Sequence, residues 1–499
     1  MCCCGRCSPT TVTTREPRRV RATPRIVAAV EVRSIDYVPA RERHGRVTDQ
    51  GPFWFLGNFV FVTVALGFVG PSLHLSLTYT VIAGTLGILF GTVFAAFHAS
   101  QGAELGLPQM IQSRAQFGYR GVVVPLVGAL LTYVGFNVID TVLVAQGLHD
   151  AWGLDKLMVT AVMTLGASAL AIWGHDWLHA AYRILFWINL PLFILISAAV
   201  LAGGVHIARP SAQALGGFSW AAFLTQFAAA ASYNLSYAPY VSDYSRYLPR
   251  TTSRAEIIGH VFAGAALSAI WLLWLGAWLA TRMGATDGLG ALMRAGDLIF
   301  KGLGAVLALL SAVTLTAAMA VNAYSGMLTA VTGVDSVRAV RPTRRLRIVV
   351  ILVLALAWFL VSISLRGDPA AVLGGFLVVL LYLLAPWTAV NLVDYFLMRK
   401  GRYAVLDLAS ADGVYGAYGA RGLIAYFVGL AASVPFFVIP GVWTGPLGRR
   451  LAGVDLAWLV SLTVAALTYV AASVTFSIEA EAAAIAASDA ALAEIDAVV

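Results

Sequence analysis

The stretch ASYNLSYAPYVSDYSRYLPR, residues 231–250, interrupts an apolar segment that begins at Phe218. It contains five tyrosines, four serines, Asn234 and Asp243. Inside a membrane every backbone polar group needs a partner within the protein, and Pro239 removes a backbone donor and clashes with the preceding turn. A span broken in this way persists where it is buried in protein or lines an aqueous cavity, as in the discontinuous helices of secondary transporters. The stretch therefore predicts a broken membrane helix with a binding site at the break.

Composition places most of the chain in a membrane. Hydrophobic residues make up 60% of its 499 residues and charged residues only 12%, about half of the roughly 25% that is typical of soluble domains. Many apolar runs reach the roughly 20 residues that a membrane helix needs. We therefore predict an all-α polytopic membrane protein with twelve spans, at 52–72, 77–98, 122–147, 156–174, 183–204, 218–242, 257–281, 302–331, 348–365, 371–396, 422–440 and 456–476.

The distribution of positive charge predicts the orientation. With the N-terminus inside, most of the 33 lysines and arginines fall in the N-terminal tail and the inner loops, so we predict cytoplasmic termini and a plasma-membrane location. The predicted organisation is a tail over 1–50, a transporter domain over 51–476 and a tail over 477–499. The net charge of +8 follows from this topology and does not indicate a nucleic-acid partner. Four cysteines, crowded at positions 2, 3, 4 and 7, fit a reducing cytoplasm.

A second interruption lies in the first span. Gly57, Asn58, Gly67 and Gly70 fall within Pro52–Ser72, and glycine at this density lets a helix unwind and its neighbours approach closely. Two broken spans in one chain are typical of secondary transporters, which bind substrate and coupling ion at mid-membrane between the broken helices.

The motifs around these breaks resemble one family. Residues 238–249, APYVSDYSRYLP, are similar to the sixth-span signature of the nucleobase:cation symporter-1 family, the purine-cytosine permeases. Residues 30–59 and 113–121 resemble its entry segment and the loop after its second span. The resemblance implies a LeuT-type fold, with spans 1–5 and 6–10 as an inverted repeat and two extra C-terminal helices. It also implies cation-coupled uptake of cytosine or a purine by alternating access, with allantoin, hydantoin, uracil or a thiamine-precursor pyrimidine as alternatives.

The third and sixth spans carry the predicted substrate residues. Phe136 and Asp140 lie four apart on one helical face, where the family commonly has a tryptophan that stacks on the base and an amide that reads its edge. An acid at mid-membrane is costly unless it is paired, protonated or hydrated, which makes Asp140 a functional candidate; a structural acid bonded to neighbouring hydroxyls is the alternative. Asn137 lies about 100° round the helix and can face protein instead. The other predicted substrate residues are Tyr233, Asn234, Ser236, Tyr237 and Asn322.

The eighth span predicts a cation site. Hard cations prefer oxygen ligands, which Ser311, Thr314 and Thr316 offer, together with Gly57 and Asn58 at the first break. The coupling ion is Na⁺ or H⁺, and we expect no other cofactor and no metal site. In the same span Asn322-Ala-Tyr-Ser matches a family motif, but Ala318 and Met319 replace two amides, so the identity of the base stays open.

Two further features lie at the predicted inner face. Asp243 and Arg246, three apart, suit an ion pair or an inner-gate contact. The connection 173–183 is predicted to be a cytoplasmic loop; its His175 and His179 have the spacing of a helical metal pair but no third ligand.

Two other classes of protein fit less well. A channel needs a continuous polar stripe or a charged ring, whereas the polar groups here cluster at mid-depth. A membrane-embedded enzyme needs a catalytic constellation, and the sequence shows none. We therefore expect a monomeric transporter for a small heteroaromatic molecule, and not an enzyme.

Overall fold

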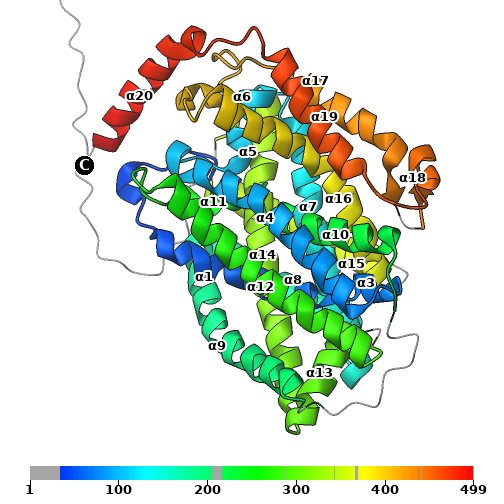
Figure 1. Cartoon of the computed structure of the whole chain (residues 1–499). Coiled ribbons are helices and arrows are strands. Elements are labelled where there is room, and N and C mark those ends of the chain that lie inside the picture. The colour runs from blue at the N-terminus through cyan, green and yellow to red at the C-terminus, as the bar shows by residue number, and fades with distance from the viewer. Residues whose placement is uncertain are drawn as a thin grey trace, which may run out of the picture. The chain divides into compact units, whose positions relative to one another are not determined.

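The protein folds as a bundle of helices (Figure 1). The structure is a computed structural model that describes residues 34–203, 205, 216–285, 287–341, 343–365, 369–439 and 441–497, with the backbone alone at 369–371. The four cysteines lie outside these residues. Short elements connect the long helices: η1 (Ala40–Glu42), α5 (Gln109–Gln112), α6 (Arg114–Phe117), α13 (Gly288–Ile299), η4 (Val405–Ala409), η5 (Val434–Phe436), α18 (Pro446–Arg450), η6 (Ile478–Glu481) and the two-stranded pair β1 (Val438–Ile439) and β2 (Trp443–Thr444).

Each predicted span corresponds to a helix or a broken helix. Eight spans within the described residues are long and apolar enough to cross a membrane. They are α4 (Leu77–Leu105), α7 (Val123–Trp152), α8 (Lys156–Trp173), α9 (His175–Leu201), α12 (Arg254–Arg282), α14 (Leu303–Val337), α15 (Arg344–Ser364), and α16 (Pro369–Val393) continued by the π-helical turn η3 (Asp394–Met398). The other predicted spans are the broken pairs below, α17 (Ala420–Ser433) and α19 (Ala457–Ala472).

Both predicted breaks are present. The first span consists of α1 (Val47–Asn58) followed by α2 (Phe61–Leu66) and α3 (Val69–Ser72), with a bend of 60°. Its freed Asn58 carbonyl accepts a hydrogen bond from the Thr63 hydroxyl at 2.6 Å. The sixth span consists of α10 (Trp220–Leu235) and α11 (Val241–Ser245), and the Pro239 carbonyl between them accepts from the Tyr133 hydroxyl at 3.1 Å. Side chains thus replace the backbone partners that a membrane cannot supply.

Helices on one side of the protein meet backbone to backbone. A methyl group on Gly91 of α4 would lie 2.2 Å from the Ala231 carbonyl oxygen of α10. A methyl group on Gly276 of α12 would lie 1.9 Å from the Val64 carbonyl oxygen of α2. Only glycine permits such an approach. We call these two contacts the glycine seam.

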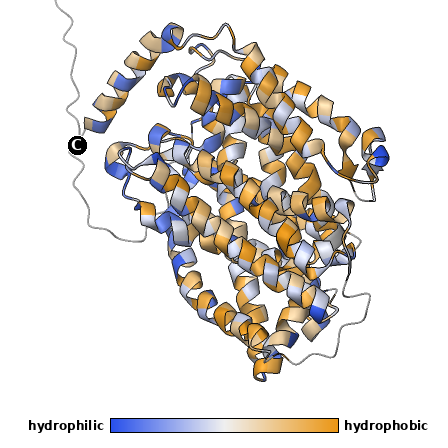
Figure 2. Cartoon of the chain, in the orientation of Figure 1, coloured by the Kyte–Doolittle hydropathy of each residue, from blue (hydrophilic) through white to orange (hydrophobic). Residues whose placement is uncertain are grey.

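Hydrophobic residues, coloured orange in Figure 2, predominate along the long helices, and many of them are exposed. Leu165, Trp187, Leu267 and Val353 are each more than 60% exposed. Exposed apolar surface of this kind suits contact with lipid.

A buried group of charges lies where α16 ends. The Arg399 guanidinium pairs with the carboxylates of Asp394 and Glu481. The hydroxyls of Tyr403 and Tyr469 each donate to Asp394 at 2.7 Å. We call these five residues the Arg399 cluster.

The last described helix, α20 (Ala482–Ala497), follows Glu481 and contacts distant segments. The Asp496 carboxylate accepts from the backbone nitrogen of Ala40 at 2.8 Å and from the Tyr37 hydroxyl at 3.2 Å. The Ser488 hydroxyl accepts from the backbone nitrogen of Leu406 at 3.1 Å. The segment predicted to be the C-terminal tail therefore packs against the segment before α1 and against η4.

Candidate functional site

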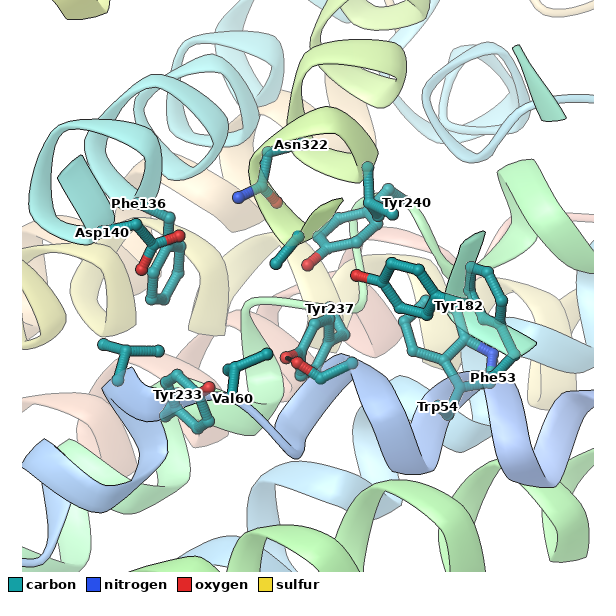
Figure 3. A pocket seen from close by; sticks show the side chains of 14 residues that line it. Phe53, Trp54, Val60, Phe136, Asp140, Tyr182, Tyr233, Tyr237, Tyr240 and Asn322 are labelled. Atoms are coloured by element: carbon teal, nitrogen blue, oxygen red, sulfur yellow. Dashed lines mark hydrogen bonds between the residues drawn. The ribbon is translucent and has the colours of Figure 1, made fainter. Parts of the chain in front are cut away.

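A small cavity of about 30 Å³ lies where the two broken helices meet (Figure 3). Side chains reach it from α1, α2, α7, α9, α10 and α14, and from the turn that follows α10. Its lining residues are Phe53, Trp54, Gly57, Val60, Val62, Phe136, Asp140, Tyr182, Tyr233, Tyr237, Tyr240, Ala318, Val321 and Asn322.

Aromatic rings form one wall of this cavity. Phe53 stacks on Tyr182, with ring centroids 4.9 Å apart and planes 25° apart. Trp54 meets Tyr237 edge to face at 5.3 Å, and Tyr237 meets Tyr240 at 5.5 Å. Such a wall presents ring faces and edges, and another flat aromatic molecule packs well against them.

Hydrogen-bond acceptors line another part of the cavity wall: Figure 3 shows Asp140 beside the Phe136 ring, and Asn322 on a neighbouring helix. The Asp140 side chain is 2% exposed, and its Oδ1 atom has no hydrogen-bond partner among the described residues. Asn322 donates through Nδ2 to the Asn137 Oδ1 atom at 3.0 Å, which leaves its own Oδ1 for the cavity. A buried polar atom without a partner is costly, so this wall is suited to a ligand that brings N–H donors.

Five predicted substrate residues line the cavity together: Phe136, Asp140, Tyr233, Tyr237 and Asn322. The sequence also predicts a ring held between Phe136 and Tyr233 or Tyr237. In the structure Phe136 meets Tyr233 directly, edge to face, with centroids 5.8 Å apart. A substrate between these two rings would have to separate them.

Two other predicted substrate residues do not line the cavity. Asn234 accepts from Asn58 Nδ2 at 3.1 Å and donates to the Thr92 hydroxyl at 2.6 Å. Ser236 donates to the Tyr233 carbonyl at 2.6 Å. Both side chains stabilise the helix breaks, because they use their polar groups on neighbouring protein atoms.

The predicted cation ligands have separate partners. Gly57 lines the cavity, and Asn58 bonds to Asn234 and to the Ala265 carbonyl at 2.8 Å. Thr314 donates within α14 and accepts from Asn189 of α9 at 3.0 Å. Thr316 donates to the Ala312 carbonyl at 2.8 Å, and Ser311 is buried on the same helix. In this conformation Asn58 uses its Nδ2 atom on α10 and α12, whereas its buried Oδ1 atom has no hydrogen-bond partner among the described residues. Thr314 bonds within α14 and to α9, so the predicted ligands are not gathered around one point.

The predicted gate residues are both buried, at 1% exposure for Asp243 and 0% for Arg246. The Asp243 carboxylate accepts from the backbone nitrogen of Gln109 at 3.0 Å. Arg246 donates to the Ser34 carbonyl at 2.6 Å and to the Tyr324 hydroxyl at 3.1 Å. The pair thus joins α11 to the entry segment, to the first residue of α5 and to α14.

Sequence reasoning missed four aromatic lining residues. Phe53 and Trp54 lie one turn before the first break, and the aromatic residues beside Gly57 were the available signal. Tyr240 follows Pro239 inside the quoted stretch and was not singled out. Tyr182 lies in the connection 173–183.

The prediction of a loop over 173–183 was wrong for most of its length, because α9 begins at His175. His179 stacks on Phe53 with centroids 4.3 Å apart, and His175 lies 4.2 Å from the Tyr247 ring. Both histidine rings pack against aromatic rings of the helix bundle, so α9 can include these polar residues instead of beginning after them.

Comparison with known proteins agrees with this geometry. The model of a family described as permease for cytosine/purines, uracil, thiamine, allantoin matches residues 37–461. The chain belongs to this family. It is 33% identical over 449 residues to the putative purine-cytosine permease YxlA of Bacillus subtilis, which covers 88% of this chain and 95% of YxlA. It is 24% identical over 475 residues to the purine-cytosine permease fcyB of Emericella nidulans, covering 88% of this chain and 87% of fcyB.

Solved structures show the same fold. Mhp1, a nucleobase-cation-symport-1 family transporter with bromovinylhydantoin bound, superposes with a TM-score of 0.68 at 18% identity, covering 89% of this chain and 95% of Mhp1. A Na⁺-coupled sialic acid symporter superposes with a TM-score of 0.57 at 13% identity, covering 88% and 92%. The predicted LeuT-type fold is confirmed, and the chain is a multi-pass membrane permease.

Proposed function

We propose that this permease is a secondary active transporter that takes up a nucleobase, with cytosine or a purine as its substrate, by alternating access coupled to Na⁺ or H⁺. The observation that carries the proposal is the cavity at the two helix breaks. It combines a wall of aromatic rings with the unpartnered Asp140 oxygen, and it lies where secondary transporters bind their substrates.

The two walls favour a flat ring with donors on its edge. Stacking and edge-to-face contacts with aromatic rings contribute about 0.5–1.5 kcal/mol each beyond burial. An ionised carboxylate at Asp140 accepts hydrogen bonds and donates none. Amino groups and ring N–H groups of cytosine, adenine or guanine supply the matching donors. Relatives named as purine-cytosine permeases support the same substrates.

Binding is tested with the purified full-length protein. Thermal shifts are measured against cytosine, uracil, adenine, guanine, hydantoin, allantoin and thiamine precursors. We expect the largest stabilisation from an amino-bearing base, and counterflow of that base in proteoliposomes, because a carrier exchanges labelled substrate without net flux. Stabilisation by hydantoin or allantoin alone would replace the proposed substrate, and a lack of counterflow would reject the carrier.

Cation coupling is tested by ion replacement. If sodium binds beside Gly57, Asn58 and the eighth-span hydroxyls, sodium tightens substrate binding and substrate tightens sodium binding by the same factor. Uptake that is equal in sodium and choline, but abolished by a protonophore, would reject the sodium site and favour H⁺.

The proposed orientation places both termini and the Asp243–Arg246 gate on the cytoplasmic side of the plasma membrane. Arg250 lies four residues beyond Arg246, and its side chain is 54% exposed. With the four native cysteines replaced by serine, Arg250→Cys should react with a membrane-impermeant maleimide in inside-out vesicles only. Labelling in right-side-out cells would reverse the topology.

A further inference from the structure

Two linked hydrogen bonds join α14 to α7 behind Asn322, on the side of its side chain that faces away from the cavity. The backbone carbonyl of Met319 accepts from Asn137 Nδ2 at 3.1 Å. Asn137 Oδ1 in turn accepts from Asn322 Nδ2 at 3.0 Å. Asn137 is fully buried and does not line the cavity, whereas Asn322 does. Asn137 therefore contacts a cavity residue from behind.

The direction of this hydrogen-bond chain is fixed at its origin. A backbone carbonyl only accepts hydrogen bonds, so Asn137 must turn its NH₂ group toward Met319 and its oxygen toward Asn322. Asn322 must then turn its own NH₂ group toward Asn137. An isolated asparagine could present either end of its amide to a ligand, but here the oxygen of Asn322 is the end left for the cavity.

This orientation adds a second acceptor to that of Asp140. The two residues lie on neighbouring helices, and both side chains reach the same cavity (Figure 3). A ligand amino group that reaches both side chains can donate one N–H to each oxygen. A ligand carbonyl in the same place would face these two oxygens, and neither side could donate a hydrogen bond. Buried polar groups left unpaired in this way discriminate strongly between similar ligands.

We propose that Asn137 is a positioning residue that sets substrate preference by holding Asn322 as a hydrogen-bond acceptor. Resting on the proposed nucleobase transport, this inference specifies the substrate class as bases with an exocyclic amino group over their oxo counterparts. Cytosine is preferred over uracil, and adenine over hypoxanthine. In each pair the amino donor of one member is a carbonyl acceptor in the other.

The test compares these two pairs in competition for uptake of a labelled base by the full-length protein in proteoliposomes. In the unmodified protein we expect the amino member to compete at least about tenfold better, as one mispaired buried group predicts. In Asn137→Leu the amide of Asn322 can turn, and the preference should fall to within about threefold. Thr141→Val is the matched control, since the Thr141 hydroxyl donates to the Asn137 backbone carbonyl at 2.6 Å and lies 3.7 Å from the Met319 sulfur but contacts neither side-chain amide of the hydrogen-bond chain. Its preference should stay unchanged.

A double substitution separates this role from a structural one. A carboxylate accepts in either orientation, so adding Asn322→Asp to Asn137→Leu should restore the preference for the amino member. A general disturbance of the helix contact would not be repaired in this way. An undiminished preference in Asn137→Leu, or no recovery in the double variant, overturns the inference.

If Asn137→Leu does not fold, Asn137→Asp takes its place in the test, because its carboxyl group can still accept the hydrogen bond from Asn322. Retained preference is expected there, and its loss counts against the inference. If the unmodified protein transports none of the four bases, the proposed function falls and the inference with it. If it transports them without preference, the inference alone falls.

Discussion

Asp140 and Asp394 are both buried carboxylates, at 2% and 1% exposure, but their surroundings are opposite. Asp394 belongs to the Arg399 cluster, where Arg399, two tyrosine hydroxyls and the Gln116 amide all donate to it. Asp140 lines the cavity, and its Oδ1 atom has no partner among the described residues.

The difference separates an acid whose hydrogen-bond sites are filled by the protein from one that can still accept a hydrogen bond from a ligand. A buried carboxylate whose acceptor sites are filled has no capacity left for a ligand, and breaking its ion pair leaves an uncompensated charge. A carboxylate with an unfilled site lowers stability in the empty protein, and a ligand that brings a donor can relieve that cost. Burial alone therefore does not distinguish the two acids, whereas the state of their hydrogen bonds does.

The largest effect should come from opening the Arg399 cluster. Arg399→Met leaves Asp394 and Glu481 buried without their cation, which should lower the free energy of unfolding by about 3–5 kcal/mol. Chemical denaturation in detergent measures it. The control is Arg402→Met, three residues on and exposed, with an expected change below about 0.5 kcal/mol. Equal effects would mean that the cluster is no more important than a surface arginine.

Asp140→Asn should show the reverse pattern. Stability should hold or rise, since no native partner is lost, while affinity for an amino-bearing base should fall by about tenfold to a hundredfold, as for a lost hydrogen bond to a charged group. Affinity in the parent should also weaken as the pH is lowered, because a protonated carboxyl loses an acceptor site, and the variant should lack this dependence. Isothermal titration over a pH series measures both.

The control for this substitution is Asp150→Asn on the same helix. Asp150 is exposed and accepts from Gln146 at 2.8 Å, and binding should be unaffected. A pH profile and selectivity in Asp140→Asn that match the parent would make Asp140 a second structural acid.

Substitutions of Phe136 test the aromatic part of the cavity, and we expect a smaller change in substrate affinity. Phe136→Ala should weaken base binding by about threefold to tenfold more than Phe136→Trp, corresponding to about 0.5–1.5 kcal/mol of ring contact. Equilibrium binding of the preferred base measures the ratio. Unchanged affinity in Phe136→Ala would place the substrate elsewhere in the cavity.

The smallest effect concerns Asp455. Its carboxylate has fewer hydrogen-bond donors than that of Asp394 but, unlike the Asp140 Oδ1 atom, it is not left without a partner. Burial raises the pKa of Asp455 to about 6, although the Tyr382 hydroxyl and the Ala457 nitrogen donate to it. The folded state then holds a proton that the unfolded state, with a pKa near 3.9, releases. Stability should therefore fall by about 1 kcal/mol as the pH rises from 5 to 7. Asp455→Asn should remove this part of the pH dependence in detergent denaturation, and an identical profile would contradict the assignment.

The sequence allowed much of the fold to be predicted, since apolar length locates spans, and proline and clustered glycines locate breaks. It also pointed to Phe136, Asp140 and Asn322, which line the cavity in the structure, because a polar or aromatic residue at mid-membrane needs an explanation. Their contact with substrate stays a prediction. It did not predict that Asn234 and Ser236 turn away from the cavity, or that α9 begins at His175. Those facts depend on the rotation of a helix and on ring stacking with distant residues, which no local pattern encodes.

The glycine seam has a consequence for laboratory evolution. Selection for uptake of a new compound can change the residues of the cavity, but every amino-acid substitution at Gly91 or Gly276 places atoms where a carbonyl oxygen already lies. A glycine such as Gly374, with open space at the same test, should accumulate substitutions in the same library. Deep sequencing of the surviving variants should then show glycine retained at both seam positions, whichever compound was used for selection.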